Sequence, residues 1–127
     1  MAETVVDASA LLALLNEEPG ADTVVEALPG SAISAVNLSE VVSKLSEGGM
    51  PVKAIYQALQ PLGLEIVPFD EDQAYQTGFL RIATRDLGMS LGDRACLSLA
   101  AKLGAVALTA DKAWCGVSMG TSVKLIR

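Results

Sequence analysis

Four acidic residues could bring their carboxylates to one site, namely Asp7, Glu40, Asp93 and Asp111. Asp7 directly follows a short β-branched run, and Asp111 lies two residues after a second apolar run. Asp93 lies in the first turn of a predicted helix, and Glu40 about one and a half turns into another. Because ligands of open parallel sheets bind outside the carboxyl ends of the strands, these positions predict a shared acidic site.

The residue types limit the chemistry of such a site. The sequence contains no histidine, which excludes Ser-His-Asp and Cys-His catalysis and nearly every catalytic zinc site. Carboxylate oxygens without histidine or thiolate favour Mg²⁺ or Mn²⁺. One or two such ions can activate a water and stabilise the leaving oxygen of a phosphodiester. The four acids therefore predict metal-assisted phosphodiester hydrolysis.

Each acid also has a structural explanation. Lys44 stands four residues after Glu40 and could form an ion pair with it, so the spacing leaves metal ligation and that pair equally open. Asp93 could complete a capping box with Ser90, and Asp111 could cap a short helix. A function for the set as a whole is favoured, because uncompensated carboxylates repel one another.

Strands alternating with helices must position these acids. Four strands are predicted at residues 3–6, 31–34, 64–68 and 105–109, and a fifth, at the sheet edge, at 123–126. Helices are predicted at residues 8–15, 21–28, 34–47, 51–60, 70–84 and 91–103, the fifth of them carrying Tyr75, Phe79 and Ile82. Uniformly apolar strands in this order are typical of a parallel sheet covered on both faces. We expect an α/β fold and one domain over residues 1–127.

Composition indicates the compartment. The apolar fraction is 51%, but no apolar run approaches the roughly 20 residues of a membrane helix, and no targeting segment is recognisable. Cys96 and Cys115 form neither a CxxC pair nor a Cys/His cluster, which indicates free thiols packed as small apolar side chains. We expect a soluble protein of the cytoplasm with no membrane partner.

The net charge of −6 argues against a nucleic-acid partner, since phosphate binding usually shows a basic surface. Divalent cations held by the acids would invert the local field and weaken that objection. The candidate contacts to a phosphate backbone are Arg94, Lys112, Arg81 and Arg85, with ordinary solvated charge as the alternative for each.

The acids fall within four segments that carry a family resemblance: VVDAS at 5–9, SAVNLSE at 34–40, SLGDRACL at 90–97 and LTADKAW at 108–114. In order and spacing, and over nearly the whole chain, they resemble the PIN domain and, within it, the VapC toxins of bacterial toxin–antitoxin pairs. The resemblance implies a three-layer α/β/α domain around a parallel sheet of about four to five strands. It also implies endonucleolytic cleavage of RNA, a homodimer, and inhibition by a VapB-like antitoxin that binds DNA.

The resemblance further implies roles for individual residues. Asp7 and Asp93 would be the principal ligands of Mg²⁺ (or Mn²⁺), with Glu40 and Asp111 completing the site directly or through water. The side chains that would support these ligands are Ser9, Asn37 and Thr109, for which capping or turn roles remain equally open. The residues after Asp111 offer no further acid, so we expect one metal ion. Trp114 could stack on a base, although packing in the core is favoured.

Three other classes compete with this interpretation. A phosphoacceptor receiver domain would have a pair of acids near the first strand and a lysine after the last, and the chain has Asp7 alone. A haloacid-dehalogenase-type phosphatase would have an aspartate where Ser9 stands. A non-catalytic PIN-like module that binds RNA or protein stays open, with the intact carboxylates counting against it.

Overall fold

Five parallel strands form one sheet in the order β3-β2-β1-β4-β5. They are β1 (Thr4–Val6), β2 (Ser31–Ser34), β3 (Glu65–Val67), β4 (Val106–Thr109) and β5 (Val123–Leu125). The computed structural model describes residues 2–116 and 121–127. The sheet confirms the predicted α/β class, and β5 lies at the edge as expected.

In the described residues, six helices connect the strands: α1 (Ala8–Leu15), α2 (Ala21–Ala27), α3 (Ala35–Glu47), α4 (Val52–Leu59), α5 (Glu71–Thr84) and α6 (Leu91–Leu103). Short 3₁₀ helices follow at η1 (Leu28–Gly30), η2 (Gln60–Leu62), η3 (Arg85–Leu87) and η4 (Lys112–Gly116). Four helices begin where a side-chain oxygen accepts a hydrogen bond from a backbone N–H of the first turn; these caps are Asp7, Ser34, Asp70 and Ser90. The predicted helix bounds agree with the structure within one residue at most ends.

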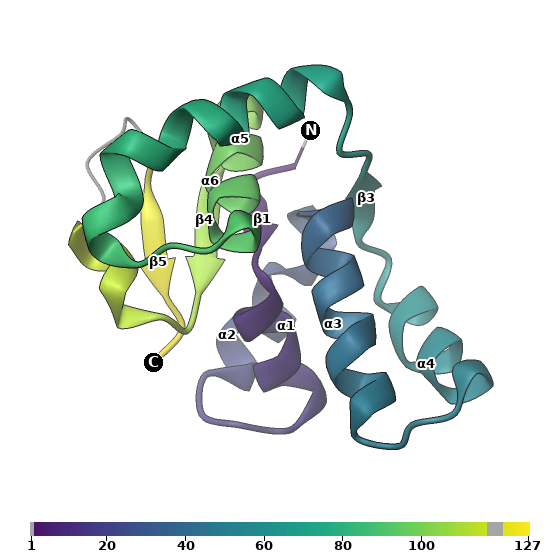
Figure 1. Cartoon of the computed structure of the whole chain (residues 1–127). Coiled ribbons are helices and arrows are strands. Elements are labelled where there is room, and N and C mark those ends of the chain that lie inside the picture. Colours follow the sequence, from purple (N-terminus) through teal and green to yellow (C-terminus); the bar gives the residue numbers. More distant parts are fainter. Residues whose placement is uncertain (1, 117–120) are drawn as a thin grey trace.

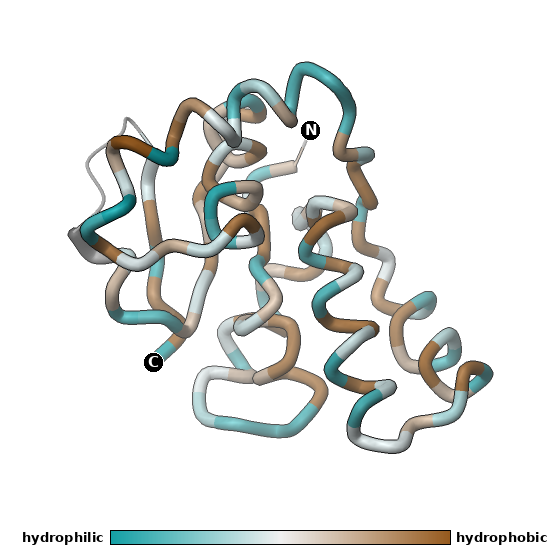
Figure 2. The backbone as a smooth tube through the Cα atoms, in the orientation of Figure 1, coloured by the Kyte–Doolittle hydropathy of each residue, from teal (hydrophilic) through white to brown (hydrophobic). Residues whose placement is uncertain are grey.

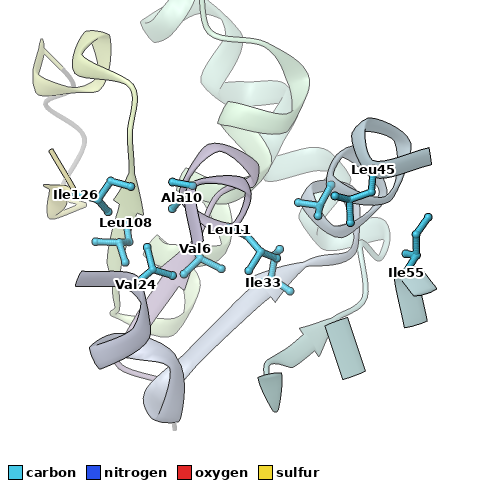
Figure 3. Close-up of a cluster of buried hydrophobic side chains, with 11 residues drawn as sticks. Val6, Ala10, Leu11, Val24, Ile33, Leu45, Ile55, Leu108 and Ile126 are labelled. Carbon is cyan, nitrogen blue, oxygen red and sulfur yellow. The ribbon is translucent and has the colours of Figure 1, made fainter. Parts of the chain in front are cut away.

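Both faces of the sheet are covered, because successive strand residues point to opposite sides. Val6, Ile33 and Leu108 belong to one buried cluster, which packs against α1 to α4 (Figure 3). Val5, Ala32 and Ala107 belong to a second cluster, which packs against α6. Figure 1 shows α6 beside the sheet and α5 outside α6, and Figure 2 shows hydrophilic residues along the loop between α1 and α2. The result is the expected three-layer arrangement.

Two expectations about individual side chains can be compared with this core. Trp114 is completely buried in the second cluster, so the packed interpretation is confirmed. Cys96 is a buried free thiol, as expected, whereas the side chain of Cys115 lies outside the described residues. Within residues 2–116 and 121–127, no helix combines the length and apolar character needed to cross a membrane.

The capping box at the start of α6 makes a testable contribution to stability. Ser90 Oγ accepts from the backbone N–H of Asp93 at 3.2 Å, and Asp93 Oδ2 accepts from the backbone N–H of Ser90 at 3.0 Å. We expect Ser90→Ala to lower the free energy of unfolding by about 1 kcal/mol in urea titrations. Ser39→Ala, an exposed serine inside α3, is the control. Equal stability of the two variants would show that the cap contributes nothing.

Candidate active site

Asp7 directly follows β1 and caps α1, and its carboxylate is held by three neighbouring groups. Oδ1 accepts from the backbone N–H of Ala10 at 2.8 Å and from the Ser9 hydroxyl at 2.8 Å. Oδ2 accepts from the Thr109 hydroxyl at 2.6 Å. The residue is only 3% exposed. Neighbouring strands β1 and β4 thus meet at this carboxylate, at the carboxyl edge of the sheet.

The two hydroxyls that donate to Asp7 are themselves oriented by the backbone. Ser9 Oγ accepts from the N–H of Ala110 at 3.0 Å, and Thr109 Oγ1 accepts from the N–H of Asp111 at 3.0 Å. Because each hydroxyl already accepts from an amide, its proton is free to point at the carboxylate. The structure therefore brings both predicted supporting hydroxyls into contact with Asp7.

Burial is the main reason that Asp7 has an unusual acidity. Loss of hydration raises the pKa of Asp7 from 3.8 to about 6. The hydrogen bonds from Thr109, Ala10 and Ser9 oppose this rise in pKa, and the charge of Asp93 adds to it. At neutral pH the carboxylate is ionised in surroundings that disfavour its charge, so a cation placed beside it would be stabilising.

Glu40 is held by Asn37 rather than by a lysine. Asn37 Nδ2 donates to Glu40 Oε1 at 2.9 Å and to the Gly92 carbonyl at 2.9 Å, with only 1% of Asn37 exposed. The ion pair with Lys44 is not observed, because the one salt bridge among the described residues joins Arg127 to Glu18 at 3.1 Å. Asn37 thus ties the first turn of α3 to the first turn of α6, and Glu40 keeps an uncompensated charge.

Gly92 is a site residue that the sequence did not single out. It is buried at the second position of α6, and a Cβ atom there would overlap the carboxylate of Glu40. The glycine therefore leaves the space that Glu40 occupies. The signal in the sequence is a glycine between a helix cap and Asp93, where capping alone does not require a small residue.

Asp93 lies near Asp7 and Glu40. Its Oδ2 completes the capping box, so the capping alternative is observed, and no described residue donates a hydrogen bond to its Oδ1. Burial raises the pKa of the Cys96 thiol well above its usual value, and the charges of Asp7, Asp93 and Glu40 raise it further. The charges of three acids thus act on one buried thiol, that of Cys96, which was not a predicted site residue.

Asp111 is more exposed than the other three acids. Its side chain is exposed, and Oδ1 accepts from the backbone N–H of Ala113 at 2.9 Å, which caps η4 as the structural alternative anticipated. Asp111 is linked to Asp7 through its backbone. Its N–H donates to Thr109 Oγ1, and the Thr109 hydroxyl donates to Asp7. The described residues contain no group of three acids or cysteines spaced to hold an ion together. Asp111 therefore does not complete a closed carboxylate ring.

The candidate RNA contacts are also placed differently from one another. Arg94 Nη1 donates to the Thr77 carbonyl at 3.1 Å, and Arg94 Nε is buried without a partner. This arginine therefore fastens α5 to α6. Lys112, Arg81 and Arg85 are exposed. Of the four candidates, these three can meet a phosphate backbone without rearrangement.

The molecule was compared with known proteins. Similar solved structures include a toxin–antitoxin complex from Klebsiella pneumoniae (22% identity, TM-score 0.76, 98% of each chain covered) and DNA-bound VapBC from Salmonella typhimurium (16% identity, TM-score 0.79, 100% of each chain). VapBC-1 from nontypeable Haemophilus influenzae is another (17% identity, TM-score 0.73, 97% of each chain). No curated protein matches the sequence. The family model described as PIN domain matches residues 4–118, and the chain therefore belongs to the PIN domain family.

Proposed function

We propose that this protein is a metal-dependent endoribonuclease and acts as the toxin of a toxin–antitoxin pair. The observation that carries the proposal is the buried Asp7 carboxylate, which has no cationic partner among the described residues and lies near Asp93 and Glu40. Uncompensated carboxylates at the carboxyl edge of a parallel sheet are a feature that function, rather than stability, explains.

The donor set fits a hard divalent cation. Only carboxylate, hydroxyl and amide oxygens are available at the edge, which suits Mg²⁺ (or Mn²⁺). Asp7 and Asp93 would be the principal ligands, with Glu40 and Asp111 contributing directly or through water. Since no three acids among the described residues are spaced to hold an ion by themselves, water would supply the remaining ligands. A bound ion would supply an activated water and stabilise the charge of the leaving oxygen.

The protein's own residues would orient these ligands. Ser9 and Thr109 fix the plane of the Asp7 carboxylate and favour its ionised form. Asn37 fixes Glu40 against the start of α6. Lys112, next to Asp111 and exposed, is placed to contact the RNA backbone. Arg94 would need to leave the Thr77 carbonyl before it could do the same.

The proposed partners are a VapB-like antitoxin and a second copy of the chain, in the cytoplasm. Support comes from the three similar structures described above, all of which are toxin–antitoxin complexes. The chain also has an apolar groove of about 560 Å³ between α3, α4 and β3, lined by residues such as Val42, Ile55 and Leu59 and by no charged side chain. This groove has no catalytic groups and is separate from the acidic edge.

RNA cleavage by the purified protein, free of antitoxin, tests the proposal. We expect cutting with Mg²⁺ or Mn²⁺, none with chelator, and a decrease of about a hundredfold or more in Asp93→Asn. Asparagine keeps an acceptor for the Ser90 N–H, so the variant retains the cap of α6. Cutting that persists in a folded Asp93→Asn variant would contradict the mechanism. Failure to cut any RNA in a broad panel would favour a non-catalytic PIN-like binding module, which would not need three acids spaced to hold an ion, and the described residues contain no such group.

A further inference from the structure

A cavity of about 350 Å³ lies between α5 and α6, apart from the apolar groove. The hydroxyl of Ser98 donates to Gln73 Oε1, and Arg94 reaches the Thr77 carbonyl, so the two helices run antiparallel (Figure 1). The cavity is therefore at the start of α5 and the end of α6. Ser98, on its wall, follows Asp93 by five residues. It thus lies about 8 Å along α6 from the acidic edge and about 140° around the helix from Asp93.

Helix α5 contacts α6 through a side that is partly polar. Gln73 and Thr77 are buried on this side, while the half-buried Leu80 packs against the second core cluster. Tyr75 and Phe79 are exposed. A helix that buried only apolar side chains here would leave no hydrogen bonds to satisfy. Each polar group buried between α5 and α6 needs a partner instead.

Gln73 supplies a hydrogen-bond donor that lacks such a partner. The residue is only 3% exposed, and its Oε1 accepts from the Ser98 hydroxyl at a long distance of 3.4 Å. No group in the described part of the chain accepts from its Nε2. A buried amide left in this state costs free energy that a bound acceptor would recover. Because Gln73 lines the cavity, rotation about the last bond of its side chain turns Nε2 toward that space.

Apolar walls and two opposite charges make up other parts of the cavity. Leu97 is buried on the α6 side, and Leu80 lies on the α5 side. Asp72 of α5 and Lys102 of α6 are exposed at the mouth. They do not pair with each other, since the one salt bridge within residues 2–116 and 121–127 joins Arg127 to another acid. The mouth therefore offers separate partners for a cation and for an anion.

We propose that this cavity binds a free α-amino acid whose side chain ends in a hydrogen-bond acceptor, such as glutamine. The α-carboxylate pairs with Lys102, and the α-ammonium group pairs with Asp72. The methylene groups lie between the two leucines, and the terminal carbonyl accepts from Gln73 Nε2. The volume of about 350 Å³ is near the lower end for small-molecule sites, which suits one amino acid better than a nucleotide or a peptide.

Charge selects a zwitterion over an anion or a cation. A nucleoside monophosphate would place its phosphate near Lys102 but also near Asp72, and an amine without a carboxylate would have the reverse conflict. A ligand with both charges on neighbouring atoms satisfies both groups. Because Asp72 and Lys102 are exposed, each charge pair contributes modestly, and we expect a Kd of about 0.1 to about 1 mM. The inference does not depend on the proposed nuclease activity.

Titration of the ¹⁵N-labelled chain with L-glutamine, followed by its amide resonances, tests the proposal. We expect saturable shifts at residues 72–80 and 97–102, and none along α3 and α4. N-acetyl-L-glutamine lacks the ammonium group and L-glutaminamide lacks the carboxylate, so each should bind at least about threefold more weakly. No saturable shift up to about 20 mM L-glutamine would overturn the proposal. Tighter binding of uridine monophosphate at the same residues would overturn the zwitterion as the ligand.

Matched variants locate the contacts. Gln73→Met keeps the length of the side chain and removes the donor, so the Kd for L-glutamine should rise by about tenfold. The variant also removes a buried unpaired group, so its stability should be equal or higher, which separates lost binding from unfolding. Lys102→Gln should raise the Kd by about threefold, whereas Lys44→Gln, at an exposed lysine of α3, should not change it. An unchanged Kd in Gln73→Met would overturn the assigned site, whatever the nuclease assay shows.

Discussion

In chelator at about pH 7.5, the Asp7→Asn variant should be more stable than the parent chain, and it should not cut RNA when metal is restored. The stability gain follows from the buried charge, since Asp7 is 3% exposed and its pKa lies near 6 instead of 3.8. A difference of about two pKa units corresponds to about 3 kcal/mol at most. Asparagine removes the charge and keeps an oxygen for the Ala10 N–H, and its NH₂ group would face the Thr109 hydroxyl, which can turn to accept from it. Loss of a principal ligand should lower cleavage by about a thousandfold or more.

The raised pKa of Asp7 also determines how the stability of the metal-free chain depends on pH. Between about pH 4 and pH 6, the folded metal-free chain binds a proton at Asp7 that the unfolded chain has lost. Its stability should therefore fall as the pH rises through this window and then stay level, and Asp7→Asn should lack this contribution. Urea titrations in chelator measure it. Asp22→Asn, on the exposed side of α2, should change stability by less than about 0.5 kcal/mol. A less stable Asp7→Asn variant would contradict the buried-charge explanation.

A single methyl group at position 92 should reduce metal affinity without unfolding the protein. In Gly92→Ala the new Cβ overlaps the Glu40 carboxylate, and the end of that flexible side chain is the part able to move. Glu40 would then leave Asn37, and we expect Mn²⁺ affinity to fall by about tenfold to a hundredfold. Stability in chelator should be unchanged or slightly higher, because alanine favours a helix more than glycine does.

Mn²⁺ binding followed by electron paramagnetic resonance gives the affinity without relying on cleavage. Gly48→Ala is the control, since a Cβ there would make only ordinary contacts at 3.5 Å with the carbonyl oxygens of Lys44 and Leu45. In a Glu40→Ala background, Gly92→Ala should have no further effect on affinity. Additive losses in the double variant would show that Gly92 acts by another route than Glu40.

Local signals predicted much of the fold. The caps Ser34, Asp70 and Ser90 mark helix starts because their side chains satisfy amides of their own first turn. The short segment Ser31–Ser34 forms the predicted strand and is buried on both faces. The orientation of α5 was not predicted, because a periodic stripe containing Tyr75 and Phe79 indicates a helix without indicating which side meets the core.

The site shows the same division between local and long-range information. The positions of Asp7 and Asp93 at a strand end and a helix start could be inferred from their immediate neighbours. The contact between Asn37 and Gly92 joins residues 55 positions apart, and no spacing rule predicts it. The sequence left both a site role and the cap of a short helix open for Asp111, and spacing alone could not decide that its exposed side chain caps η4.

The order of the strands has a consequence for synthesis on the ribosome. β1 is made first but lies at the centre of the sheet, and its neighbour β4 follows about a hundred residues later. The Thr109 hydroxyl that holds Asp7 belongs to that late strand. A nascent chain, or one truncated before β4, therefore lacks β4 and β5. Asp7 then has only one of the two strands that neighbour β1. The candidate site around Asp7 is complete only after β4 has been made, which gives a binding partner made earlier time to be in place.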